Sequence, residues 1–120
     1  DGPCMHECLF DDRFLKDSGV TTLDFAKAMI DEGYHPMTMY FPLVVHGAML
    51  IEPTETESKR NLDDFIAVMR ALVARASAGD GDAFAAAPIS TPRRRLDETA
   101  AARQPILRWS PEVETAVAAE

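Results

Sequence analysis

The chain has 120 residues, 47% of them hydrophobic, which suffices for one small domain with a buried core and excludes compositional disorder. A formal net charge of −8 argues against nonspecific nucleic-acid binding, which requires a basic surface. No apolar run approaches the ~20 residues of a membrane span, no signal sequence opens the chain, and two cysteines are too few for a disulfide framework. We therefore expect a soluble, cytoplasmic protein, and its start at Asp1 rather than methionine suggests a piece of a longer one.

The first predicted elements are a strand and a helix. Residues 4–10 read as a strand. A helix should begin after Thr21 or Thr22, whose hydroxyls suit an N-cap, with Asp24 in its first turn. It should end at Gly33, since glycine readily takes positive φ at a helix terminus. The face expected to be buried comprises Leu23, Ala26, Met29 and Ile30.

Two more strands and the longest helix follow. The strands are predicted at residues 37–41 and 48–51, the second closed by Pro53, which cannot donate to a strand ladder. A polar elbow, residues 52–58, leads into a helix over about residues 57–76. Its apolar residues recur at three- and four-residue intervals, which predicts a buried face of Leu62, Phe65, Ile66, Met69 and Val73.

The remainder of the chain is less regular. Two short helices are predicted at residues 82–87 and 95–103, separated by an extended linker over residues 88–92, and residues 110–120 are alanine-rich. These pieces are too short to be stable alone, so they must pack on something. We expect four apolar side chains to anchor this tail across the domain: Leu96, Ile106, Leu107 and Trp109.

Short strands mixed with helices favour an α+β fold with two layers. The sheet should be small and mainly antiparallel, with the helices on one face. We expect residues 1–76 to form the α+β core and residues 77–120 a C-terminal extension that packs on the core or on a missing large domain.

A metal site is a weak candidate. Cys4, His6 and Cys8 alternate, so on a strand they share one face. Structural zinc needs four ligands, however, and same-face side chains ~6.6 Å apart suit it poorly. We expect no metal and cysteines that are buried as small hydrophobic residues.

The elbow is the better candidate for a site. Glu52 precedes the helix cap, so it is not explained as a first-turn charge that favours the helix dipole, whereas Glu55 can be. His46 lies beside a glycine near the elbow and is the best placed of three histidines for proton transfer. Residues 93–95 are three arginines, which we expect to form local ion pairs or to dock on an acidic surface.

Several stretches of the sequence resemble a known family. Residues 41–45 (Phe-Pro-Leu-Val-Val) and 49–59 (Met-Leu-Ile-Glu-Pro-Thr-Glu-Thr-Glu-Ser-Lys) are similar to the C-terminal end of the glycine cleavage P-protein. Upstream and downstream stretches agree in order: 5–7 (Met-His-Glu), 19–27 (Gly-Val-Thr-Thr-Leu-Asp-Phe-Ala-Lys), 33–36 (Gly-Tyr-His-Pro), 88–92 (Pro-Ile-Ser-Thr-Pro), 94–98 (Arg-Arg-Leu-Asp-Glu) and 101–109 (Ala-Ala-Arg-Gln-Pro-Ile-Leu-Arg-Trp). The chain looks most like the second subunit of the two-subunit bacterial form.

The resemblance implies the small C-terminal domain of a fold-type-I pyridoxal-phosphate enzyme. The parent would decarboxylate glycine and pass the aminomethyl group to the lipoyl arm of the H-protein. Its partners would be the large cofactor domain of the same chain, P-protein subunit 1 and lipoylated H-protein, with no nucleic acid and no membrane. The site residues that we expect near substrate or at an interface are His46, Glu52, Thr54 and Glu55.

The lysines indicate that this chain holds no cofactor of its own. Lys16, Lys27 and Lys59 are the only three, and none follows the strand-end histidine or serine typical of a Schiff-base lysine. No glycine-rich phosphate loop is present either. We therefore expect a fragment that helps to close the site and hold subunits together but is inactive alone. The alternative is a stand-alone, non-catalytic interaction or scaffold domain derived from the same family.

Overall fold

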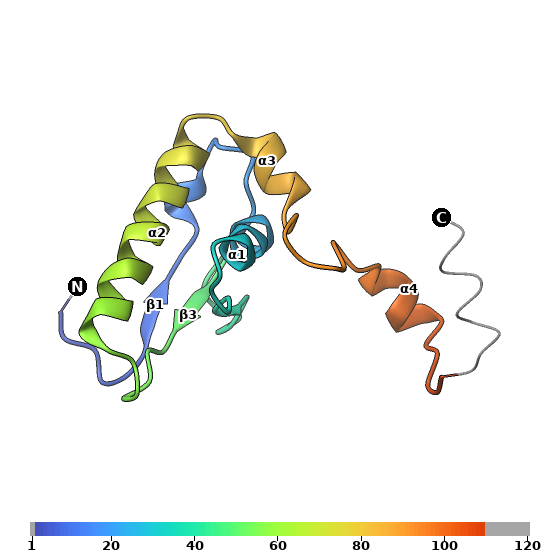
Figure 1. Cartoon of the computed structure of the whole chain (residues 1–120), viewed down its shortest axis with the longest axis horizontal. Coiled ribbons are helices and arrows are strands. Elements are labelled where there is room, and N and C mark those ends of the chain that lie inside the picture. The colour runs from blue at the N-terminus through green and yellow to red at the C-terminus, as the bar shows by residue number, and fades with distance from the viewer. Residues whose placement is uncertain (1, 110–120) are drawn as a thin grey trace.

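A computed structural model describes residues 2–109 and shows a small α+β domain from which a C-terminal segment extends (Figure 1). The short strands and the helices confirm the predicted fold class. The elements in order are β1 (Cys8–Phe10), the 3-10 turn η1 (Arg13–Leu15), α1 (Thr22–Asp31), β2 (Thr38–Met39), β3 (Met49–Ile51), α2 (Lys59–Ser77), α3 (Gly81–Ala86) and α4 (Glu98–Arg103).

The three strands form one small sheet, antiparallel as predicted, and their order is β1-β3-β2. β3 is central, and its Met49 lies opposite both Phe10 of β1 and Met39 of β2. Met49 is fully buried, so the middle of the sheet is joined to the hydrophobic core. The strands are shorter than predicted: only the last three residues of 4–10 pair, and only Thr38–Met39 of 37–41.

Helix α1 begins at the predicted cap. The Thr21 hydroxyl accepts the backbone N–H of Asp24 at 3.1 Å, and the Asp24 carboxylate accepts the N–H of Thr21 at 3.0 Å, which completes a capping box. The buried face is centred on Phe25 and Met29, one helical turn apart. Leu23 and Ile30, which were predicted to be buried, are only half-buried because they flank this line.

Helix α2 is capped by Ser58, whose hydroxyl accepts the N–H of Asn61 at 3.1 Å. Its predicted buried face is wrong in part. The fully buried residues are Leu72 and Ala76, in the C-terminal half, and Ile66 is 44% exposed. The other four are half-buried. Phe65, Met69 and Val73 pack against the edge of the core, whereas Leu62 lines a groove.

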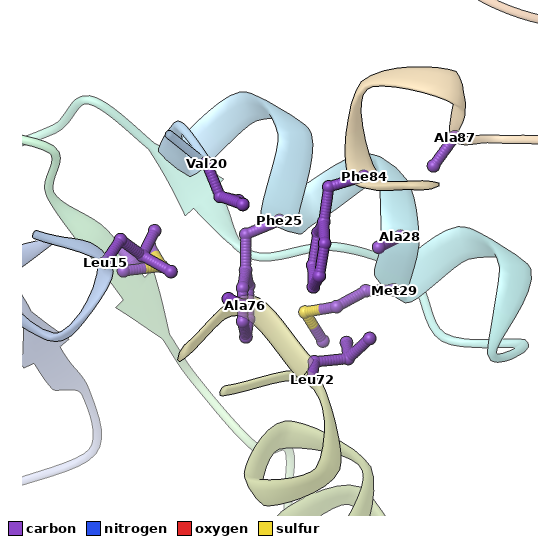
Figure 2. Close-up of a cluster of buried hydrophobic side chains, with 10 residues drawn as sticks. Leu15, Val20, Phe25, Ala28, Met29, Leu72, Ala76, Phe84 and Ala87 are labelled. Atoms are coloured by element: carbon purple, nitrogen blue, oxygen red, sulfur yellow. The ribbon is translucent and has the colours of Figure 1, made fainter. Parts of the chain in front are cut away.

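The core is built from α1, the C-terminal half of α2, α3 and η1 (Figure 2). The Phe25 ring meets Phe14 edge-on at 5.5 Å between centroids and stacks with Phe84 at 6.1 Å. The Arg75 guanidinium lies over the Phe84 ring, 5.4 Å from its centroid. Phe84 and Ala87 are both buried, so the core includes part of the segment that follows residue 76.

Polar contacts fix the next residues to α1. The Asp31 carboxylate accepts the N–H of Ile89 at 2.8 Å, the N–H of Ser90 at 2.8 Å and the Ser90 hydroxyl at 2.6 Å. The Arg95 guanidinium pairs with Asp24 at 2.7 Å and donates to the carbonyl of Phe84 at 2.9 Å. The arginines were expected to form local ion pairs, but Arg95 instead pairs with a residue distant in sequence, Asp24 of α1.

Beyond Arg95 the chain leaves the body of the domain, and we call residues 96–109 the arm (Figure 1). No residue of α4 is buried. Ile106 is 70% exposed, Leu107 90% and Trp109 71%, and Leu96 is also exposed. The prediction that these four side chains anchor the tail across this domain is therefore wrong, because the arm does not turn back onto it. The alanine-rich segment predicted at residues 110–120 lies outside the described residues.

Candidate functional site: an acidic groove at the elbow and a histidine–aspartate pair

A groove of about 670 Å³ lies beside the elbow, between the N-terminal half of α2, the end of β3 and the turn after α1. Its lining is partly apolar and includes Tyr34, Leu50 and Phe65. The Tyr34 and Phe65 rings meet edge-on with centroids 5.4 Å apart, which joins the turn to α2. The groove therefore offers an apolar surface between two separate segments of the chain.

Four carboxylates line the groove, and His35 lines it as well. The carboxylates belong to Glu32, Glu52, Glu57 and Asp64, with no lysine or arginine among the lining residues. Such a site favours cationic groups and disfavours anions such as phosphate. The chemistry of this lining suits a basic, partly apolar ligand.

The elbow itself is a short turn. The N–H of Glu57 donates to the carbonyl of Thr54 at 3.0 Å, and the hydroxyls of Thr54 and Thr56 lie 2.9 Å apart. Glu52 and Thr54 line the groove, whereas Glu55 does not. Two of the four predicted site residues thus share one surface.

His46 lies elsewhere, in the loop that leads into β3. Its Nδ1 is 2.8 Å from Oδ2 and 3.0 Å from Oδ1 of Asp12. The hydrogen bond to this carboxylate, together with its negative charge, raises the pKa of His46 above its ordinary value. Glu52 lines the groove and His46 does not, so the structure does not bring the two into one site.

The glycine after His46 makes this pair possible. Gly47 has φ of 57°, and a Cβ at this position would lie 2.2 Å from Cγ of Asp12. The Thr22 hydroxyl donates to the carbonyl of Gly47 at 2.8 Å, which ties the loop to the start of α1. Sequence reasoning missed Asp12, which is 34 residues from its partner; only the His-Gly pair at positions 46 and 47 marked the spot.

The same loop presents apolar side chains to solvent. Leu43 is 88% exposed and Val44 91% exposed. The loop is nevertheless ordered, because the Tyr40 hydroxyl accepts the N–H of Leu23 at 3.2 Å and the Tyr40 N–H donates to the carbonyl of Ala48 at 2.8 Å. A loop held by hydrogen bonds in this way, with outward apolar residues, is suited to contact another polypeptide surface.

The two cysteines were predicted to be buried, but neither is. Cys4 is exposed and Cys8 half-buried, and their sulfur atoms lie 3.5 Å apart. They lie where the chain enters the edge strand β1, away from the core, which explains the failed prediction. Among residues 2–109, no group of three or more His, Cys, Asp or Glu side chains is arranged to hold a metal ion. No helix in the same range is both long and apolar enough to cross a membrane.

Comparison with known proteins identifies the family. A family model described as "Glycine dehydrogenase, C-terminal domain" matches residues 1–86. A protein of Caulobacter vibrioides named "Probable glycine dehydrogenase (decarboxylating) subunit 2" is 70% identical over 120 residues, which is 100% of this chain and 23% of the relative. Proteins of the same name from Kosmotoga olearia and Fervidobacterium nodosum are 49% identical over 111 residues and 50% identical over 107 residues, respectively.

These two alignments cover 92% and 88% of this chain and 23% and 22% of the respective relatives. The chain therefore spans less than a quarter of the length of the relatives that it matches. The family model covers most of the folded body, from the N-terminal residues through α3. The chain belongs to the family of the C-terminal domain of glycine dehydrogenase.

Proposed function

We propose that this chain is the C-terminal part of the second subunit of a glycine dehydrogenase (decarboxylating), the P-protein of the glycine cleavage system. The observation that carries the proposal is the 70% identity over all 120 residues to a protein named as that subunit. The whole enzyme would take glycine, release carbon dioxide and transfer the aminomethyl group to lipoylated H-protein. Its further partners would be the large cofactor domain and subunit 1.

In the whole enzyme, pyridoxal phosphate would supply the electron sink for loss of the carboxyl group. The residues of this chain do not fit as its holder. Lys59 is engaged by Asp63 at 2.5 Å on the exposed side of α2, Lys16 is exposed, and Lys27 lies half-buried on α1. None of the three lines the groove, whose carboxylates would also repel a phosphate. The cofactor would therefore be held by the remaining part of the enzyme.

The role proposed for this chain is to close the site and to hold polypeptides together. Glu52 and Thr54 line the groove and would meet an approaching surface or ligand, and Glu55 would act at its edge. His46 would act at a second place, the loop with exposed Leu43 and Val44, where Asp12 favours its protonated form. Both places present groups that the described chain leaves open to a partner.

Binding to the rest of the enzyme tests the proposal against the alternative of a stand-alone scaffold domain. The probe is the Caulobacter vibrioides relative lacking the quarter that this chain matches, purified with its cofactor bound. The 120-residue chain should bind it, and Leu43→Glu/Val44→Glu should weaken binding, because two new charges would be placed at the contact. Ile89→Glu is the matched control, an exposed apolar residue outside the loop. Failure of the chain to bind the cofactor-loaded remainder at any accessible concentration would favour the scaffold alternative.

A further inference from the structure

The arm has no partner among the residues that the structure describes. Its helix α4 has six residues, while isolated helices need ~12–15 residues to be stable in water. Its base is well fixed, by Arg95 on Asp24 and by Ser90 on Asp31, so the arm is presented in a defined direction. The remaining stabilisation must come from another surface.

The end of the arm has a definite chemical character. Residues 99–109 contain Arg103 and Arg108, no aspartate or glutamate, and three exposed apolar side chains, Ile106, Leu107 and Trp109. In a chain with a net charge of −8, this is a locally basic and apolar stretch. It would be attracted to a surface that is apolar and negatively charged.

The groove at the elbow is such a surface. Leu50 and Phe65 supply apolar area, and Glu57 and Asp64 supply carboxylates, without any lysine or arginine in the lining. Asp64 also has an exposed pair with Arg60 at 3.8 Å, a distance that leaves room for competition by a second arginine. A segment that carries both tryptophan and arginine is the kind that binds such a groove well, because these residue types are enriched among the anchors of interfaces. The two surfaces are complementary both in charge and in polarity.

The arm does not reach the groove of its own chain. Figure 1 shows α4 at one end of the molecule and the start of α2, which borders the groove, at the other. A second copy has no such restriction, and exchange between two copies would fill both grooves by the same contact. We propose that the arm of one copy lies in the elbow groove of a second copy, with Trp109 among the apolar lining residues and Arg103 and Arg108 facing Glu57 and Asp64.

This pairing rests on the arm and the groove alone and goes beyond the proposed function. It predicts a dimer of the 120-residue chain whose formation weakens with added salt, because exposed charge pairs are screened. It also predicts that Trp109, the only tryptophan, changes from water-exposed to buried as the dimer forms. Fluorescence and mass then report the same event.

The test is light scattering of the 120-residue chain over a range of concentrations, together with the emission maximum of Trp109. Wild type should dimerise with a blue shift. Arm reversal (Arg103→Glu/Arg108→Glu) and groove reversal (Glu57→Lys/Asp64→Lys) should each weaken the dimer by at least about tenfold. Combining both reversals should restore it, because the charges are again opposite.

A matched control lies next to the groove. Asp63 and Asp64 are neighbours on α2, and each pairs with a base four residues earlier, but only Asp64 lines the groove. Asp64→Lys should therefore weaken the dimer and Asp63→Lys should leave it unchanged. Three results would overturn the proposal: a monomer with water-like Trp109 emission at all concentrations, a blue-shifted monomer, or a dimer insensitive to the reversals. The first would leave the arm to a different partner, and the second would place it on its own chain.

Discussion

Replacing Phe84 by alanine tests how far the folded core extends along the chain. Phe84 is 1% exposed, its ring stacks with Phe25, and the Arg75 guanidinium lies over the ring. Burial of such a ring is worth ~1.5–3 kcal/mol, the aromatic pair adds ~0.5–1.5 kcal/mol, and core Phe→Ala changes cost ~3–5 kcal/mol in total. Since the short helix α3 lies at the edge of the core and can settle into the space, we expect a loss of about 3 kcal/mol.

The assay is urea unfolding followed by circular dichroism at the helix band, with an unchanged slope against denaturant. Trp109 is unsuitable as the reporter because it lies on the arm, outside the core. Ile89→Ala is the control: Ile89 is 68% exposed, so its loss should stay within ~0.5 kcal/mol. A loss below ~1 kcal/mol for Phe84→Ala would refute the conclusion that α3 is part of the core.

Four further outcomes are expected. Asp31→Asn should lower the free energy of unfolding by ~1 kcal/mol, because it weakens charge-assisted bonds to Ser90. Burial raises the pKa of the Asp31 carboxyl, but the hydrogen bonds outweigh burial and lower the pKa below 3.8. The stability that Asp31 contributes is therefore present above pH 3.8 and is lost as the pH falls through the folded-state pKa. In an NMR titration, the pKa of His46 should lie above 6.5, and it should fall in Asp12→Asn. The stability contributed by the His46–Asp12 pair is complete below pH 6.5 and is lost as the pH rises through the folded-state pKa of His46. Gly47→Ala should destabilise the domain by ~1–3 kcal/mol and lower the pKa of His46, because the new Cβ displaces Asp12. Added pyridoxal phosphate should give no borohydride-fixed adduct at a specific lysine of the isolated chain, and stoichiometric labelling of one lysine would contradict this.

Local chemistry made much of the fold predictable. Thr21 and Ser58 cap α1 and α2 through hydrogen bonds to residues three positions on, a pattern that is visible in the sequence. Gly33 takes a φ of 85° at the end of α1, as its residue type suggested. The antiparallel pairing of three short strands followed from their length and their spacing between helices.

What failed depended on contacts between distant residues. The apolar stripe of α2 exists, but the part of it that is buried depends on where the helix meets the core. Leu72 and Ala76 are therefore buried, and Ile66 is exposed. The sequence does not distinguish an exposed arm from a packed one, because Trp109 and its apolar neighbours would be the same in both cases. The pairing of His46 with Asp12 depends on a loop geometry that no local pattern encodes.

The candidate site was predicted as a set of residues but not as an arrangement. The elbow was predicted as a site because Glu52 precedes the helix and so is not there to stabilise its first turn. The structure places Glu52 and Thr54 in the lining of a groove. The acidic character of that groove comes equally from Glu32 and Asp64, which lie on other elements and carried no signal of their own. Burial and charge of the assembled surface are properties of the fold and not of any one segment.

The most direct test of the account is activity in a chimera. The 120 residues would replace the matched quarter of the Caulobacter vibrioides relative, and glycine-dependent exchange of labelled carbon dioxide would be measured with subunit 1 and lipoylated H-protein present. If the chain is the C-terminal part of the same enzyme, the chimera should retain exchange within about tenfold of the unaltered relative, a difference of ~1.4 kcal/mol. A folded, cofactor-loaded chimera with no glycine-dependent exchange would contradict the proposal that this chain is part of that enzyme.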